Sequence, residues 1–319
     1  MAADTAQAAK DQDWTQNPAL TPVGQSPSSQ TRQTGDQTSA LTAGKSEAAT
    51  KRLLSIDRQS QVIRCAHMLG LFDRPADERA LGALLESPAI PGLTESLTDL
   101  RPTEWQMILA KLRRARLLAG EDPHNPGQLD THPLVREYFG EQLRSQQLLA
   151  WKERNRGLYN YYRTHAPQLP NSFGEMEPLF LAVICGCNAG LFRDALHEVY
   201  IPRIQRGNAS FAANVLGVRG ALLSVLAQFF ERGHWGLPVQ TGIEGQSLTA
   251  EDQLFVLTQA GLLLTTTRGL GAPEARICYD RAEPLCHSLN SPASPLCGTA
   301  RTMALFPHDG QVECDPATC

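Results

Sequence analysis

The stretch AEDQLFVLTQAGLLLTTTRGLGAPEARICYDRAEPL, residues 250–285, decides the fold class of this chain. We interpret it as two helices with a turn at Gly269 or Gly271, because glycine readily adopts the backbone conformation that ends a helix. Ala260 and Gly261 leave room for a second helix to approach closely. Small and aromatic residues recur at helical spacing on that second helix, at Ala275, Tyr279 and Ala282. The stretch therefore predicts an α-helical hairpin.

Another hairpin is predicted upstream in EPLFLAVICGCNAGLFRDALHEVYIPRI, residues 177–204, with its turn at Asn188-Ala189-Gly190. Small and apolar residues occupy places that match those of the hairpin at 250–285: Ala182, Gly190, Phe192, Ala195 and Leu196. The match requires a two-residue insertion in the turn of the hairpin at 250–285. Helix pairs with small residues at their contact are typical of tetratricopeptide repeats. The alternative is a generic all-α bundle.

The segments around these hairpins also have helical periodicity. AWKERNRGLYNYYRTHA, residues 150–166, places four apolar or aromatic side chains on one face: Trp151, Leu158, Tyr159 and Tyr162. NVLGVRGALLSVLAQFF, residues 214–230, is a further helical stretch. We therefore expect a mainly α fold with a tetratricopeptide-like helical array over residues 149–290.

The preceding region, residues 53–148, has an order of elements that is typical of a winged-helix domain. The predicted elements are helices at 62–72 and 77–87, a helix within 101–120 capped by Thr103, a β-hairpin at 117–132 around the turn EDPHNPG, and a helix beginning at Pro133. The third helix carries an apolar stripe made of Trp105, Ile108, Leu109 and Leu112.

Both ends of the chain have a different composition. Residues 1–52 are rich in Gln, Thr, Ser and Ala and sparse in apolar residues, so they cannot bury enough surface to offset the entropy of ordering. Residues 291–319 have no sustained hydrophobic period, and a repeat array would normally continue or end in a polar capping helix. We predict a disordered tail at 1–52 and an irregular tail at 291–319.

The composition limits the class of protein. The net charge of −4 is close to neutral, and no apolar stretch approaches the roughly 20 residues of a membrane-spanning helix. The first residues have no apolar core of a signal peptide. The eight cysteines form no pair of C-x-x-C motifs, so we expect buried or free thiols in a cytoplasmic protein. Disulfides or a metal site at Cys297, Cys314 and Cys319 are the alternative.

Gly44-Lys45-Ser46 matches the last three letters of the phosphate-binding loop G-x-x-x-x-G-K-[ST]. Ser39 stands where the first glycine should be, and no apolar run upstream predicts the strand that this loop requires. We therefore expect no nucleotide site at Lys45. The sequence also contains no G-x-S-x-G or H-E-x-x-H motif, so we expect that the chain is not an enzyme.

Three stretches resemble the C-terminal half of bacterial STAND-class signal-transduction ATPases. They are MLGLFDRPADERALGALLESPAIPGLTESL at 68–97, LDTHPLVREYFGEQLR at 129–144 and GCNAGLFRDALHEVYIPRIQRGN at 186–208. In that family a P-loop NTPase core, often preceded by an effector domain such as TIR, is followed by a winged helix and tetratricopeptide-like repeats. The resemblance covers about residues 60–290 and implies a regulatory and protein-interaction portion without the NTPase core. ATP or ADP is implied as a cofactor only when such a core is joined to it.

The resemblance also implies a role for His132. STAND winged helices often hold a histidine in a Met-His-Asp-type motif, where it contacts bound ADP and keeps the protein closed. Here the motif is Thr131-His132-Pro133, which departs from the family pattern on both sides of the histidine. His132 is thus the candidate ADP-sensing residue. The alternative is that His132 caps the helix or packs locally.

Two kinds of partner follow from the residues. Stacked helical hairpins present a surface for a protein or peptide, which Tyr159, Tyr162, Tyr200 and Arg203 would reach unless they pack between helices. A winged-helix DNA-binding transcription regulator with a helical sensing domain is the alternative function. It would use basic residues on or near the third helix: Lys111, Arg113, Arg114 and Arg116. Acidic residues elsewhere in this region dilute the positive field, so we expect protein partners rather than DNA.

Overall fold

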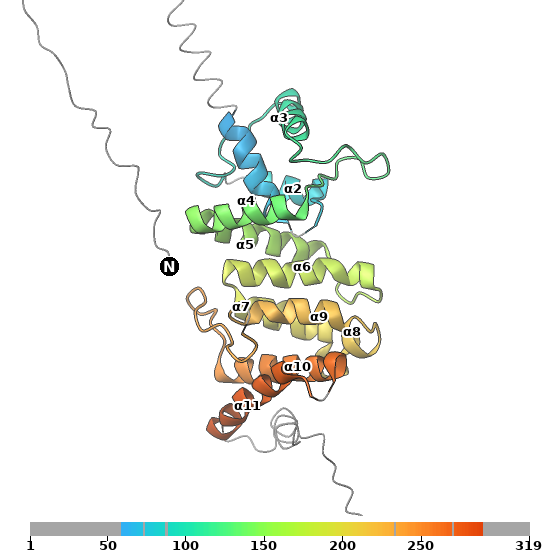
Figure 1. Ribbon diagram of the computed structural model, residues 1–319, viewed down its shortest axis with the longest axis vertical. Helices are drawn as coiled ribbons and strands as arrows, with labels where there is room; N and C mark the ends of the chain where they lie inside the picture. Colours follow the sequence, from blue (N-terminus) through green and yellow to red (C-terminus); the bar gives the residue numbers. More distant parts are fainter. Residues whose placement is uncertain (1–58, 73, 87–88, 233, 270, 290–319) are drawn as a thin grey trace, which may run out of the picture. The chain divides into compact units, whose positions relative to one another are not determined.

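A computed structural model shows the arrangement of the helices (Figure 1). It describes residues 59–72, 74–86, 89–232, 234–269 and 271–289. The chain divides into two compact units between Leu54 and Ser55, and all described residues belong to the second unit. Within this part the elements are helices joined by turns, which confirms the mainly α-helical class. The predicted tails at 1–52 and 291–319, with Lys45, lie outside the described residues.

Four helices make up the N-terminal portion of the described chain. Their bounds are 59–69, α2 Glu78–Leu85, α3 Pro102–Arg114 and α4 Pro133–Gln146. The side chain of Asp77 caps α2 by accepting a hydrogen bond from the backbone N–H of Ala80 at 2.8 Å. Helix α3 begins two residues earlier than predicted, because the Glu104 carboxylate accepts a hydrogen bond from the backbone N–H of Arg101 at 3.1 Å and Pro102 occupies the first turn. Thr103 is therefore not the cap.

The predicted β-hairpin at 117–132 was wrong. The described residues contain no strand, and the segment closes with a single backbone hydrogen bond from Ala119 N to Asp130 O at 2.8 Å. Pro123 and Pro126 have no backbone N–H, so this loop has two fewer hydrogen-bond donors for pairing. Leu129 pairs instead with Ala76 in an isolated antiparallel bridge. This portion therefore has the helices of the predicted winged-helix domain without a β-wing.

Helices α5 Leu148–His165 and α6 Phe173–Ala189 follow as a long antiparallel pair. As predicted, Trp151, Leu158, Tyr159 and Tyr162 are buried on one face of α5. The predicted turn at residues 188–190 is also confirmed, because Gly190 ends α6 with a φ of 84°, a conformation that favours glycine.

The chain then continues without a break through α7 Phe192–Asp194 into η1, Ala195–Gln205, which is a π-helix. Pro202 lies inside η1, and its ring would clash with the carbonyl of residue 198 in a regular α-helix, so the wider coil accommodates it. The short elements that follow are η2 Gly207–Ala209, α8 Phe211–Asn214, α9 Arg219–Leu226 and η3 Ala227–Phe229.

The hairpin predicted at 250–285 is confirmed. It consists of α10 Ala250–Arg268 and α11 Pro273–Ser288, and α10 ends at Gly269 with a φ of 98°. A capping box between Thr249 and Asp252 begins α10.

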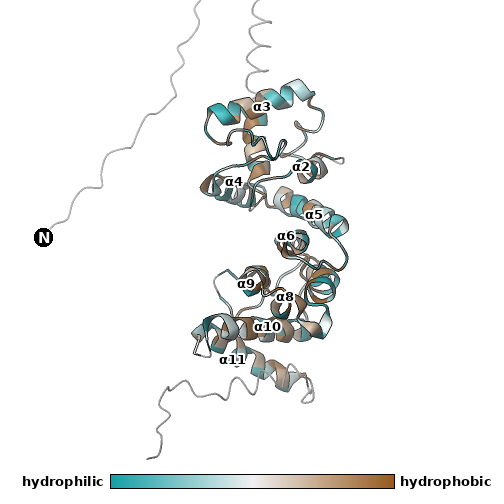
Figure 2. Cartoon of the chain, turned by 90° about the vertical axis from the view of Figure 1, so that its right-hand side faces the viewer, coloured by the Kyte–Doolittle hydropathy of each residue, from teal (hydrophilic) through white to brown (hydrophobic). Residues whose placement is uncertain are grey.

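The helices from α4 onward pack in sequence order (Figure 1): α4 on α5, α5 on α6, α6 on η1 and α9, α9 on α10, and α10 on α11. Helix α2 also packs on α5. Hydrophobic colouring dominates α9 and α10 in Figure 2, whereas α3 carries many hydrophilic residues. Buried side chains of neighbouring helices make up one continuous hydrophobic core. The boundary at 148/149 and the tetratricopeptide-like character of the array stay predictions.

Glycines allow the closest helix contacts. A Cβ atom on Gly261 of α10 would lie 2.6 Å from Cε1 of Tyr279 on α11, and one on Gly186 of α6 would lie 2.9 Å from Cδ2 of Tyr159 on α5. Gly70 and Gly140 approach each other so closely that a Cβ on Gly70 would lie 2.4 Å from the backbone N of Gly140. Any larger residue at these positions would push the packed elements apart.

We predict that Gly261→Ala lowers the free energy of unfolding by about 1–3 kcal/mol, because the added methyl group overlaps the buried Tyr279 ring. Gly157→Ala in α5 is the matched control. Nothing lies within 4 Å of its Cβ position, so the substitution should raise helix stability by up to about 1 kcal/mol. Urea unfolding followed by circular dichroism measures both changes. Equal effects of the two substitutions would contradict the packing argument.

Candidate functional site

His132 lies directly before α4 and caps it. Its Nδ1 accepts a hydrogen bond from the backbone N–H of Leu134 at 3.2 Å, and Pro133 fills the first turn, where no N–H is needed. The side chain of His132 is exposed. The capping role that the sequence left as an alternative is thus confirmed, and the contact with ADP stays a prediction.

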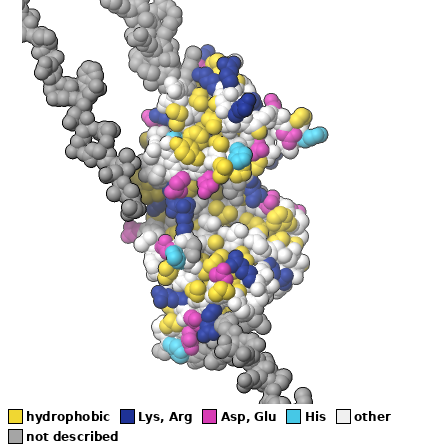
Figure 3. Space-filling view, in the orientation of Figure 1, with side chains coloured by type: hydrophobic (Ala, Val, Ile, Leu, Met, Phe, Trp, Pro, Cys, Tyr) yellow, Lys and Arg dark blue, Asp and Glu magenta, His cyan; other side chains and the backbone are white. Residues whose placement is uncertain are grey.

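The outer face of α4 exposes large apolar side chains. Leu134 is 68% exposed and Tyr138, one turn later, is 63% exposed. Glu137 and Glu141 lie on α4 near them and are also exposed, whereas Gly140 and Leu143 face the core. Hydrophobic side chains gather over α4 and the helix at 59–69 in Figure 3. This α4 face, defined by Leu134, Glu137, Tyr138 and Glu141, combines an apolar centre with negative charge.

The basic residues predicted to contact DNA lie at the end of α3. Lys111, Arg114 and Arg116 are exposed and Arg113 is half-buried. Arg113 Nε donates a hydrogen bond to the carbonyl of Ala119 at 3.3 Å, so this side chain also fixes the loop after the helix. Figure 3 shows a gathering of basic side chains over α3. The structure therefore brings the four basic residues together at one place.

The aromatic residues expected on a binding surface lie inside the molecule instead. Tyr159, Tyr162 and Tyr200 are buried, and burial raises the pKa of the Tyr159 and Tyr200 hydroxyls. Arg203 is buried too, and its guanidinium donates hydrogen bonds of 2.7–2.9 Å to the carbonyls of Arg163, Ala166 and Pro167 at the end of α5. These four residues pack between helices, which was the alternative that the sequence left open.

Arg154 is a buried residue that the sequence did not single out. Its guanidinium donates hydrogen bonds to the carbonyl of Leu84, at the end of α2, and to the hydroxyl of Thr94. Burial lowers the pKa of Arg154 to about 10, partly offset by Glu153. In the sequence KERNR at 152–156 this arginine is indistinguishable from the charged residues of a solvated helix face.

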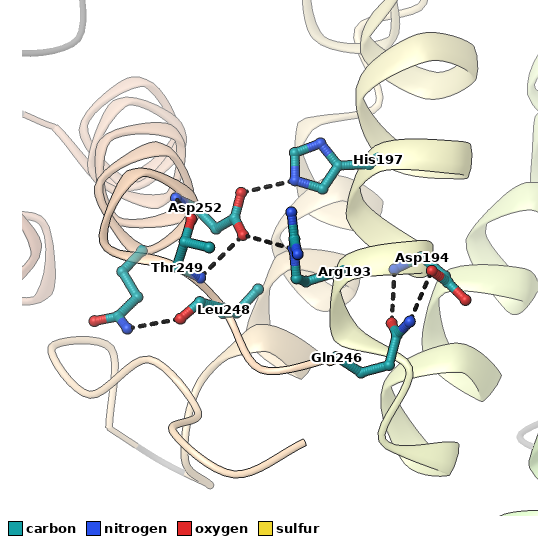
Figure 4. A network of polar contacts seen from close by, with 8 residues as sticks. Arg193, Asp194, His197, Gln246, Leu248, Thr249 and Asp252 are labelled. Atoms are coloured by element: carbon teal, nitrogen blue, oxygen red, sulfur yellow. Dashed lines mark hydrogen bonds and ion pairs between the residues drawn. The ribbon is translucent and has the colours of Figure 1, made fainter. Parts of the chain in front are cut away.

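A polar network joins the start of α10 to α7 and η1 (Figure 4). Asp252 is only 5% exposed, and its carboxylate accepts hydrogen bonds from the backbone N–H of Thr249 at 3.0 Å and from Nε2 of His197 at 2.7 Å. Nε of Arg193 lies 3.5 Å from Oδ2 of the same carboxylate. The two basic side chains offset the cost of burying the carboxylate.

A second contact stands beside this network. The side-chain amide of Gln246 donates to Oδ1 of Asp194 at 2.9 Å and its carbonyl accepts from the backbone N–H of Asp194 at 3.1 Å. In the sequence, only the Thr249-x-x-Asp252 capping pattern could have drawn attention to this region.

The described residues offer no metal site, since they contain no group of three or more His, Cys, Asp or Glu side chains that could hold an ion. Five cysteines fall in this part of the chain and all are buried: Cys65, Cys185, Cys187, Cys278 and Cys286. Burial raises the pKa of the Cys65 and Cys278 thiols to about 12, which suppresses the reactive thiolate. Cys297, Cys314 and Cys319 lie outside the described residues. None of the described helices is long and apolar enough to cross a membrane.

Comparison of the chain with protein-family models, with curated proteins and with solved structures finds no match. The resemblance to STAND proteins therefore rests on the motifs in the sequence.

We predict that Asp252→Ala lowers the free energy of unfolding by about 2–3 kcal/mol, because it removes the carboxylate half of the α10 capping box and leaves His197 and Arg193 without the carboxylate. Asp280→Ala is the control. It removes an exposed pair with Arg276 on α11 and should change stability by less than about 0.5 kcal/mol. Thermal and urea unfolding measure both. If the control were as damaging as Asp252→Ala, the network would not hold the two hairpins together.

Proposed function

We propose that this chain is the non-catalytic regulatory and protein-interaction portion of a STAND-type signalling protein. The observation that carries the proposal is the exposed α4 face, which begins two residues after His132 in the motif that the family resemblance identifies. A helix that packs on one side and exposes leucine and tyrosine on the other is typical of a protein docking surface. The proposed occupant of the α4 face is the NTPase core, with His132 at the edge of the contact.

The rest of the described chain supports a scaffold role. Its helices pack in series, and the aromatic residues that might have formed a second contact surface are used between them. A change at α4 is transmitted to the array through α5, because α4 packs on α5 and Arg154 ties α5 to the end of α2. The trigger would act on the array, and the N-terminal helices at 59–146 would relay it to the core.

A crosslinking experiment tests the proposed docking surface. A photoreactive amino acid replaces Tyr138 in the full chain, which is expressed in cells of the organism that encodes it. We expect a crosslinked product that contains a P-loop NTPase domain, because the α4 face is apolar and exposed. The same label at Val215, which is 66% exposed in the turn after α8, is the control and should not give this product.

A docking-deficient variant completes this test. Leu134→Glu with Tyr138→Glu should abolish the crosslink from a label at neighbouring Glu137, with an unchanged melting temperature, since both side chains are exposed. Products that contain no NTPase domain, or equal yields from Tyr138 and Val215, would refute the proposal.

The second candidate function, a DNA-binding regulator, is favoured by one observation. Lys111 and Arg114 are exposed near the end of α3, and Arg116 follows them. A gel-shift titration over salt separates the two functions. We expect at most weak binding that is independent of DNA sequence and vanishes at moderate salt, because three or four cations form few phosphate contacts.

Lys111→Gln with Arg114→Gln is the variant for the DNA titration, and Arg144→Gln on α4 is its control. Tight, sequence-dependent binding that is lost only in the α3 variant would replace the proposed function by the DNA-binding one.

A further inference from the structure

A cleft of about 510 Å³ lies where the N-terminal helices meet the α5–α6 pair. One wall consists of residues 70–72 and α4, and the other consists of α5 and α6. The volume falls in the range of roughly 300–1,000 Å³ that is usual for sites of small organic ligands. The cleft does not include Leu134, Tyr138 or His132, but it shares Glu137 and Glu141 with the α4 face.

The lining of this cleft is mostly aromatic and aliphatic. Phe72, Trp151 and Tyr162 contribute rings, and Leu181 contributes an aliphatic side chain from α6. All four residues are buried within the fold, so only their surfaces toward the cleft are accessible. An apolar, planar ligand body fits such a lining, because aromatic rings pack well against one another in offset or edge-on contacts.

Arg136 supplies an incompletely paired positive group at the same place. This residue lines the cleft, its side chain is only 11% exposed, and its Nη1 is buried without a hydrogen-bond partner. Its ion-pair partner is Asp130, whose Oδ1 lies 3.9 Å from that nitrogen, which is too far for a hydrogen bond. A buried donor without a partner is costly, so an anionic oxygen would be stabilised beside it.

Arg232 also lines the cleft and is held only loosely. Its Nη1 lies 3.6 Å from Oε2 of Glu141, and both side chains are largely exposed. Such a surface pair is weak and exchanges readily for another carboxylate. Glu137 and Glu141 also line the cleft, so they repel a doubly charged group such as a phosphate more strongly than a single carboxylate.

We propose that this cleft binds a small carboxylic acid with an aromatic body, with its carboxylate on Arg136 and its ring between Phe72 and Trp151. The planar guanidinium matches the geometry of a carboxylate. A ligand here would touch both the N-terminal helices and the array. Its role as a trigger rests on the proposed STAND function, but its binding does not, because the binding is measured on this chain alone.

Three probes of one shape test the proposal: 3-phenylpropanoate, 3-phenylpropanol and 3-phenylpropylamine. They are titrated into the full chain while the indole N–H signal of Trp151, identified with Trp151→Phe, is followed by NMR. We expect the acid to shift this signal saturably and to bind at least about tenfold more tightly than the amine or the alcohol, because only the acid satisfies Arg136.

Variants then assign the contact. Arg136→Gln should lower the affinity for the acid by about tenfold or more and leave the affinity for the alcohol unchanged. Arg144→Gln on the same helix should alter neither affinity. Leu181→Trp fills the cleft and should exclude all three probes. If Arg136→Gln fails to fold, as judged by its circular dichroism, Arg136→Lys replaces it. This variant should lower the affinity for the acid, because the planar contact is lost.

The proposal is overturned if the Trp151 signal stays unchanged up to the solubility limit of the acid. Equal binding of acid and amine, or an acid affinity that is insensitive to Arg136, would overturn it as well. These results would leave the crosslinking test of the α4 face unaffected, so failure of the ligand site and failure of the proposed function are separate outcomes.

Discussion

The close approach of neighbouring helices at glycine is the constraint on which the rest of the structure depends. Gly186 and Gly261 each face a tyrosine ring on the adjacent helix, and Gly70 faces the backbone of Gly140. Each contact sets how near two helices can lie, and the buried leucines and alanines around it then fill the remaining space at the density of a protein interior. Because these contacts recur along the array, the helices pack in series and each one contacts mainly its neighbours in sequence.

Buried polar contacts of Arg154, Arg203 and Asp252 determine which ends of the helices meet. Arg154 and Arg203 are buried and donate to backbone carbonyls near the ends of α2 and α5, respectively, where the last carbonyls of a helix have no partner within it. Asp252 does the reverse: it accepts from the first turn of α10 and from a basic side chain of η1. Such groups contribute more to a unique arrangement than to net stability, since burying a charge is expensive even when it is paired. Loss of one of these contacts would loosen one helix pair from the next rather than unfold a single helix.

This use of side chains decides which surfaces remain for partners. The aromatic residues Tyr159, Tyr162 and Tyr200 are used in packing, whereas the exposed apolar residues of α4 and the basic end of α3 are among the surfaces of the described chain that a macromolecule can reach. The cleft behind α4 has a different character, because it is small, ring-lined and provided with an arginine that has a donor to spare.

The sequence by itself determined the helices and their turns. The periodicity of 150–166 and 250–285 predicted buried faces that include Tyr159 and Tyr279, and the glycines at 190 and 269 marked the turns, because these signals act within a few residues. It failed at 117–132, where only one backbone hydrogen bond joins the two arms instead of a hairpin, and at Thr103, where the contact of Glu104 with the backbone of Arg101 prevailed. Only the tertiary structure decided that Arg154 and Asp252 are buried and paired, that Tyr200 is not a contact surface and that Arg136 lines a cleft. Arg154 bonds to Leu84, 70 positions away, and Asp252 to His197, 55 positions away, and a local pattern carries no information about such distant partners.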